Sequence, residues 1–168
     1  FGKKNQDASE GGEEDAGFVP RPEKAQRWVS QAKQIPDTGN YTYALTCYAS
    51  AVKLDPTDLN THKLMFEAAV GHFTSGGKPA NRKELKDVDG PHPSDKVALA
   101  ELAWMRDVNN YALAMKLLDA AVKAELEELS TWLAPKNLNM LKKAKKQSKS
   151  EYVKARNLFA EASAWDEA

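Results

Sequence analysis

The feature of this sequence that most constrains its fold is a helical periodicity that recurs along most of the chain. From Pro22 onward, apolar residues repeat three or four positions apart, and Gly or Pro residues interrupt the pattern. In the stretch GNYTYALTCYASAVKLDP, for example, Ala44, Tyr48 and Ala51 share one helix face, and Pro56 ends the helix. No segment alternates with a period of two. The sequence therefore predicts an all-α protein.

The periodic segments predict about seven helices. Residues 74–94 are rich in Gly and Pro, so we expect an inserted loop there with at most one short helical turn. Pro135 should bend or break the sixth helix, because proline lacks the amide donor. The first helix ends before Pro36, the second ends at Asp55-Pro56, and the others cover about 59–73, 95–106, 111–124, 127 onward and 150–163.

The composition of the 168-residue chain excludes several classes of protein. The 24 basic and 24 acidic side chains cancel, so no net charge attracts nucleic acid or a membrane surface. Cys47 is the single cysteine, which rules out an internal disulfide and a thiolate metal site. No apolar run approaches the roughly 18 residues that a membrane-spanning helix needs.

The sequence divides into an acidic, Gly-rich N-terminal tail, residues 1–21, and a helical domain, residues 22–168. A tail of this composition is typical of disorder when it is alone. With no signal peptide visible, we expect an intracellular location, in the cytoplasm or an internal compartment. Because the sequence starts at Phe1 rather than Met, a preceding targeting segment is an open alternative.

From residue 28 to residue 56 the chain resembles a tetratricopeptide repeat, a helix-turn-helix unit of about 34 residues. The matching residues are Trp28 in the first helix, Gly39 and Tyr41 in the turn, Ala44, Tyr48 and Ala51 on the second helix, and Pro56 as the terminator. The long insertion and the segment Trp132-Leu133-Ala134-Pro135 resemble those of degenerate repeat proteins that occur, mostly uncharacterised, in planctomycete bacteria. This resemblance covers about residues 24–168. The resemblance implies a right-handed superhelical stack of antiparallel helix pairs, that is, an α-solenoid.

The register of the later repeats can be read in two ways. Asn110-Tyr111 imitates Asn40-Tyr41, which would make 111–124 a second helix of a repeat. Counting seven helices in strict alternation instead makes 111–124 and 150–163 first helices, and we adopt this register. The predicted units are then 25–58, 59–110 with the insertion 74–94, 111–148 and a truncated repeat 149–168. In this register a helix that should cover 150–163 is missing, so we expect the chain to continue past Ala168 or another chain to fill the gap.

The resemblance implies that a protein or peptide partner binds in a concave groove lined by first helices. The residues expected to face it are Gln26, Val29, Lys33, Asn60, Lys63, Glu67, Met115 and Asp119. Some relatives bind chaperone tails through a carboxylate clamp of Lys and Asn residues. Here Val29, Lys33 and Leu64 stand at three clamp positions, and only Lys33 is polar enough to serve, which argues against that ligand.

The sequence predicts no catalytic residue, no metal site and no cofactor. It contains no HExxH, no phosphate-binding Gly-rich loop before a helix and no GxSxG. His62 and His72 lie ten residues apart on one helix, about 15 Å along its axis, which is too far for one metal ion. Cys47 lies between core positions without an identifiable base, so we interpret it as a packing residue.

The run KKAKKQSK, residues 142–149, is the only basic cluster of the sequence. It consists of Lys142, Lys143, Lys145, Lys146 and Lys149. Five lysines could bind phosphates or an acidic protein surface, or could simply form a solvated helix end. No arginine or aromatic residue interleaves the run, which argues against nucleic acid and favours an acidic protein.

These observations favour a non-catalytic scaffold that holds a protein or peptide partner within a larger multiprotein assembly. Two alternatives stay open. The chain could be an accessory or regulatory domain of a larger enzyme, or it could bind an anionic polymer through residues 142–149.

Overall fold

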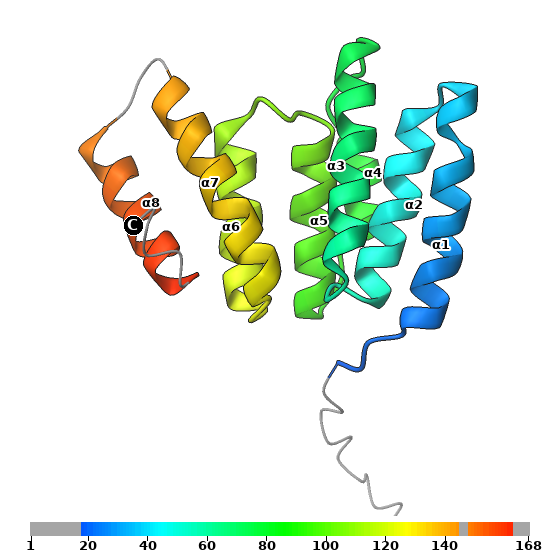
Figure 1. The fold of residues 1–168 in the computed structure, drawn as a ribbon, viewed down its shortest axis with the longest axis horizontal. Coiled ribbons are helices and arrows are strands. Elements are labelled where there is room, and N and C mark those ends of the chain that lie inside the picture. Colours follow the sequence, from blue (N-terminus) through cyan, green and yellow to red (C-terminus); the bar gives the residue numbers. More distant parts are fainter. Residues whose placement is uncertain (1–17, 145–147, 163–168) are drawn as a thin grey trace, which may run out of the picture.

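The computed structural model describes residues 18–144 and 148–162, and within these residues the protein is all-α (Figure 1). The described part contains eight α-helices, a single turn of 3₁₀ helix (η1) and no strand. The elements are α1 (Pro22–Gln34), η1 (Pro36–Thr38), α2 (Tyr41–Leu54), α3 (Leu59–Thr74), α4 (Arg82–Val88), α5 (Pro93–Met105), α6 (Tyr111–Lys123), α7 (Glu127–Lys143) and α8 (Lys149–Glu161).

Side-chain caps fix the starts of several helices. The Asn40 side chain accepts a hydrogen bond from the Tyr43 amide at 3.2 Å and begins α2. Asp58 caps α3 by accepting from the Asn60 amide at 3.0 Å, as the sequence predicts. Gly39, just before α2, has a φ of +72°, a conformation that glycine adopts without strain. The chain therefore turns sharply where the sequence places its Gly-Asn break.

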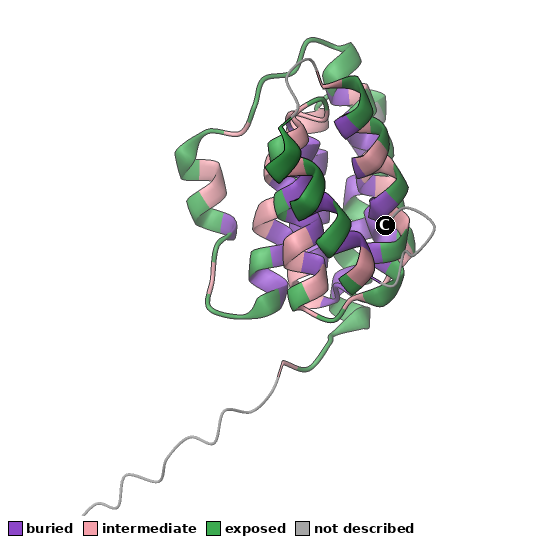
Figure 2. Cartoon of the chain, turned by 90° about the vertical axis from the view of Figure 1, so that its left-hand side faces the viewer, coloured by how far each residue is buried: buried purple, intermediate pink, exposed green. Residues whose placement is uncertain are grey.

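The helices form a row with further helices on both of its faces. The row consists of five helices that pack side by side in the order α1, α2, α5, α6, α8. Helix α3 lies against α2 and α5, and α7 lies against α6 and touches α3, so these two helices cover one face of the row (Figure 1). Helix α4 packs on α5 and stands apart from the main stack in the side view (Figure 2).

The described residues contain eight α-helices where the sequence predicted about seven, because the insertion 74–94 contains α4. This seven-residue helix begins with a capping box, in which Asn81 accepts from the Glu84 amide at 3.0 Å and Glu84 accepts from the Asn81 amide at 2.8 Å. Each reciprocal bond satisfies a backbone donor that would otherwise lack a partner. The Gly and Pro residues around α4 had suggested a loop.

Counting α4 also corrects the register of the later helices. Consecutive helices alternate in direction along the stack (Figures 1 and 2), so with α4 included α6 runs in the same sense as α2. Asn110 caps α6 at Leu113 as Asn40 caps α2 at Tyr43. Helix α6 packs in one row with α2 and α5 rather than against α3. The reading that made 111–124 and 150–163 first helices was therefore wrong, and with it the argument that α8 lacks its pair partner.

The core lies between the row and its covering helices, where small residues allow close packing (Figure 2). Ala44 and Ala51 are fully buried, which confirms that the inner face of α2 is a contact face. Three aromatic residues are partly exposed: Trp28 at 37%, Phe73 at 53% and Tyr152 at 43%.

Helix α7 continues through Pro135. Of the two predicted effects of this proline, a bend or a break, the break does not occur. Pro135 lies on the exposed side of α7, where the missing amide costs least. Nearby, the Asn137 side chain donates to the Leu133 carbonyl at 3.0 Å inside the protein. The helix is thus held by its buried face on both sides of the proline.

Candidate functional site

The structure does not bring the eight predicted groove residues into one surface. Val29 on α1 is 1% exposed and Met115 on α6 is 5% exposed, so both belong to the core. A buried side chain cannot contact a partner, which corrects these two assignments. Met115 was placed in the groove because α6 was read as a first helix, and the corrected register explains its burial.

The other six predicted groove residues are exposed or half-buried but are spread over three helices. Gln26 on α1 donates to the Asp58 carboxylate at 3.1 Å, so its amide already has a partner. Asp119 on α6 accepts from Lys123 at 2.7 Å and lies beside α8. Lys33, Asn60, Lys63 and Glu67 are exposed. Among the predicted residues, only the three on α3 lie on one helix of the covering layer.

An aromatic junction joins α3 to α7 on this covering layer. The Phe66 ring on α3 meets the Trp132 ring on α7 edge-on, with 5.8 Å between centroids and an interplanar angle of 88°. Below it, Trp104 of α5 lies 5.5 Å from Phe66 and is 1% exposed. Its indole nitrogen donates to the Val108 carbonyl at 3.1 Å. Of the two tryptophans that the sequence left without repeat positions, Trp104 is thus buried and Trp132 is half-buried.

Lys136 places its ammonium group over both rings of this junction. The Nζ atom lies 4.8 Å from the Phe66 centroid and 4.7 Å from the Trp132 centroid. Such cation–π contacts contribute about 0.5–2 kcal/mol each, depending on how far the cation is desolvated. The junction therefore holds a positive charge at a defined position on the surface.

Exposed apolar side chains continue from the junction along α3. Val70 is 43% exposed and Phe73 is 53% exposed, and with Phe66 they share one side of the helix at positions i, i+4 and i+7. On α7, Met140 is half-buried and Lys143 is exposed. We define the α3–α7 surface by these residues of the junction and of the two helices: Phe66, Val70, Phe73, Trp132, Lys136, Met140 and Lys143.

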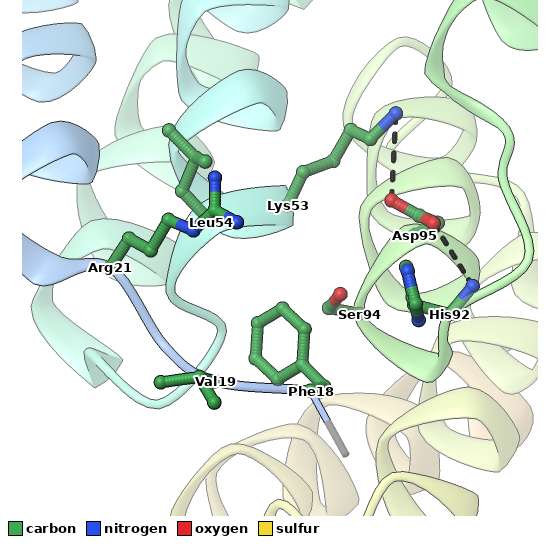
Figure 3. Close-up of a pocket in the computed structure, with 8 residues that line it drawn as sticks. All are labelled: Phe18, Val19, Arg21, Lys53, Leu54, His92, Ser94 and Asp95. Carbon is green, nitrogen blue, oxygen red and sulfur yellow. Dashed lines mark hydrogen bonds and ion pairs between the residues drawn. The ribbon is translucent and has the colours of Figure 1, made fainter. Parts of the chain in front are cut away.

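A separate pocket of about 380 Å³ lies where the N-terminal segment crosses the ends of α2 and α5 (Figure 3). Lys53 of α2 and Asp95 of α5 form an ion pair across it at 3.5 Å, and Asp95 also accepts from the His92 amide at 3.0 Å. The Ser94 hydroxyl is buried without a hydrogen-bond partner in the structure. Asp95 balances Lys53, and Arg21 also lines the pocket, so the lining carries one more positive than negative charge.

His62 and Glu101 form a fully buried pair between α3 and α5. The Nδ1 atom of His62 lies 2.8 Å from the nearer Glu101 oxygen, and its Nε2 atom lies 2.8 Å from the Pro56 carbonyl. Burial acts to lower the pKa of His62, but the Glu101 charge and hydrogen bond, the Pro56 carbonyl and Asp58 together raise it above its usual value. The pair is enclosed on all sides and serves packing between helices.

Arg106 anchors the insertion to the body of the protein. This residue at the end of α5 is 7% exposed, and its guanidinium donates to the Lys78 carbonyl at 3.0 Å and to Glu84 of α4 at 2.9 Å. It also approaches His72 Nε2 at 3.2 Å. The hydrogen bond from the Asn81 amide and the Arg106 guanidinium lower the pKa of Glu84. His62 and His72 thus serve different internal contacts.

The structure gives Cys47 the environment of a packing residue. It is fully buried in α2, and this burial raises the pKa of its thiol despite a hydrogen bond with Tyr43. Among the described residues, no cluster of three or more His, Cys, Asp or Glu side chains is arranged to hold a metal ion. None of the helices within residues 18–144 and 148–162 is both long and apolar enough to cross a membrane.

The basic cluster lies only partly within the described residues. Lys142 and Lys143 are exposed in the last turn of α7, and Lys149 is exposed at the start of α8. Lys145 and Lys146 lie outside the described residues. Of these lysines, Lys143 is also one of the residues by which the α3–α7 surface is defined, whereas Lys149 lies beside Asp119 and Lys123 of α6.

Sequence reasoning missed the apolar part of the α3–α7 surface. Neither Val70 nor Phe73 was among the residues predicted to contact a partner. A helical wheel of α3 places both beside its buried face, but only the position of α7 decides that they stay exposed. No model of a known protein family matches the chain, and no curated protein matches it either. The fold and the surface are therefore the basis for a functional proposal.

Proposed function

We propose that this chain is a non-catalytic scaffold that binds a protein or peptide partner, within a larger assembly, through the α3–α7 surface. The observation that carries the proposal is the exposure of Val70 and Phe73 beside the aromatic junction. Exposed apolar side chains that adjoin one another on a protein surface commonly mark interaction sites. Aromatic side chains are also frequent anchors of protein interfaces.

The fold supports the same proposal. Stacked helices leave extended surfaces that helical-repeat proteins use to hold partners. The resemblance of residues 25–58 to a tetratricopeptide repeat points in this direction and remains a prediction, as does the right-handed superhelix. In the corrected register, α3 and α7 are both first helices, so the proposed contact surface lies on the helices that such repeats use for binding.

The test is an affinity purification with the full chain as bait and two matched double variants. Val70→Ser/Phe73→Ser removes apolar area from the α3–α7 surface, whereas Val19→Ser/Val153→Ser removes valines that are 71% and 39% exposed elsewhere. We expect specific partners to be captured by the wild-type chain and the control, and to be depleted about tenfold with the surface variant. Thermal melts must show that both variants fold. Equal capture by all three baits would contradict the proposal.

A second candidate function is the binding of an anionic polymer by the basic cluster, and the exposure of Lys142, Lys143 and Lys149 favours it. Binding of this kind falls steeply with salt concentration, because each neutralised phosphate releases counterions. Titration with single-stranded RNA at two salt concentrations tests it. Binding that is lost in Lys142→Glu/Lys149→Glu would support this function, and binding that is absent at low salt would exclude it.

A further inference from the structure

We propose that the partner segment held by the α3–α7 surface is acidic and amphipathic. The inference rests on the proposed function and names the chemistry of the partner. It predicts a segment with apolar side chains on one side, which cover Val70 and Phe73, and with carboxylates that reach the lysines of α7.

The charges on and beside the surface are mostly positive, and Glu67, next to Phe66 on α3, is an exposed carboxylate there. The second half of α3, residues 68–74, and most of α7, residues 129–143, contain no Asp or Glu. The same ranges contain Lys136, Lys142 and Lys143. In a protein whose total charge is zero, this local excess of positive charge favours an acidic partner over a neutral or basic one.

Lys136 is already held in position for a carboxylate. Its Nζ atom lies 4.7 Å from the Trp132 centroid and 4.8 Å from the Phe66 centroid. The two rings therefore restrict the lysine side chain before any partner binds. A donor that is ordered in advance loses less conformational entropy on binding. A carboxylate could therefore pair with this ammonium while the rings keep their contact with it.

The apolar part of the surface lies beside the lysines. Helices α3 and α7 run in the same direction and diverge from the aromatic junction (Figure 1). By helical periodicity, Val70 and Phe73 lie on the same side of α3 as Phe66, which contacts Trp132 and Lys136 of α7. Lys136 and Lys143 likewise lie on the same side of α7 as Trp132. An amphipathic helix presents apolar residues at i, i+3, i+4 and i+7 beside its polar face. Such a helix could cover the valine and phenylalanine while its acidic flank faces the lysines.

The same charges disfavour a second copy of this chain as the occupant. In a two-fold dimer each surface meets itself, which would bring Lys136 and Lys143 near their own copies. Like charges at a desolvated interface cost free energy. A partner of opposite charge avoids this cost, so the proposal commits to a different, acidic protein segment.

The experiment titrates the full chain with two synthetic helix-forming peptides of about 18 residues, labelled for fluorescence anisotropy. Both carry Leu at i, i+3, i+4 and i+7, and the remaining positions are Glu-rich in one peptide and Lys-rich in the other. We expect the Glu-rich peptide to bind at least about tenfold more tightly and to lose affinity as NaCl is added.

Two charge variants on neighbouring residues locate the binding. Lys143→Glu lies on the α3–α7 surface, and Lys142→Glu changes the net charge equally about 100° further around the helix. We expect Lys143→Glu to weaken Glu-rich peptide binding several-fold more than Lys142→Glu does. Equal losses would show general attraction to the basic cluster and would overturn the proposed location.

The remaining outcomes separate this inference from the proposed function. If both peptides bind equally and both depend on Val70 and Phe73, the surface is an interaction site but its partner is not acidic, and the inference fails alone. If Val70→Ser/Phe73→Ser changes neither titration, both proposals fail. Self-association that is abolished by the same double variant would assign the surface to a second copy and overturn the inference.

Discussion

Single residues decide how closely the helices of this protein approach one another. Helix α2, which packs against α1, α3 and α5, carries alanines at positions 44, 49 and 51, all of them fully buried. At Gly71 on α3, an added Cβ would collide with the Tyr41 ring of α2. The absence of a side chain at this glycine therefore allows α3 to pack closely against α2. Small side chains at these crossings set the spacing of the row.

The first prediction concerns overpacking at one of these crossings. Ala44→Leu adds three carbon atoms where the wild-type side chain has no exposed surface, and it should destabilise the protein by about 1–3 kcal/mol. Ala112→Leu on the exposed side of α6 is the matched control and should leave stability nearly unchanged. Urea denaturation of the three proteins measures both effects, and equal midpoints for all three would contradict the packing seen at α2.

The second prediction concerns the pH dependence that the His62–Glu101 pair produces. The pKa of His62 is raised in the folded protein, so its contribution to stability is fully present below the unfolded pKa of about 6.5. That contribution is lost as the pH rises through the folded pKa. In Glu101→Gln, burial still lowers the pKa of His62, but no carboxylate raises it. The decrease in stability with rising pH should therefore vanish or reverse.

Denaturation of the wild-type protein and Glu101→Gln at several pH values between 6 and 9 checks this expectation. Groups other than His62 titrate alike in both proteins, so the difference between the two curves isolates the pair. At the low end of this pH range Glu101→Gln should also be less stable than the wild-type protein, because breaking a buried pair typically costs about 3–5 kcal/mol. Parallel curves would show that the pair does not carry the expected charge.

At the scale of elements, periodicity predicted most helices but not the insertion. The predicted bounds of 59–73 and 111–124 agree closely with α3 and α6, because the buried stripes there are long and clear. Helix α4 has too few residues for a periodic stripe, and its one strong signal was the Asn81-x-x-Glu84 capping box. Missing this helix reversed the register of every later helix.

The third prediction concerns the anchor of α4. Arg106→Met keeps much of the side-chain volume but removes the donors to Lys78 and Glu84, and it should destabilise the protein by about 1–3 kcal/mol. Lys96→Met removes the ion pair with Asp89, whose side chains are 53% and 44% exposed, and should have little effect because solvent screens such a pair. Amide exchange in α4 should rise selectively in the Arg106 variant. Unchanged exchange at residues 82–88 would show that the anchor is dispensable.

At the scale of the whole molecule, the candidate surface depends on contacts that no local pattern contains. Phe66 and Trp132 lie 66 positions apart in the sequence, and only the stacking of α7 beside α3 brings their rings together. The resemblance to a tetratricopeptide repeat implied that Lys63 and Glu67 of α3 face outward, and both are exposed. It could not predict the exposure of Val70 and Phe73, because that exposure depends on how α7 lies relative to α3.

The last prediction follows from the unequal packing of the helices within the stack. Helices α2 and α5 each pack against three or more other helices, whereas α8 contacts only α6 and α7 to a substantial extent. In stacked-helix proteins, stability is roughly a sum over units and their interfaces, so helices with few neighbours open first. Hydrogen exchange under native conditions should therefore be at least about tenfold faster in α8 than in α2 and α5, a difference of about 1.4 kcal/mol in opening free energy. Leu158→Ala on the buried side of α8 should widen this difference, while Asn157→Ala on its exposed side should not. If α2, α5 and α8 all exchanged at one rate in the wild-type protein, the stack would open as a single unit, and the gradient expected from its contacts would be wrong.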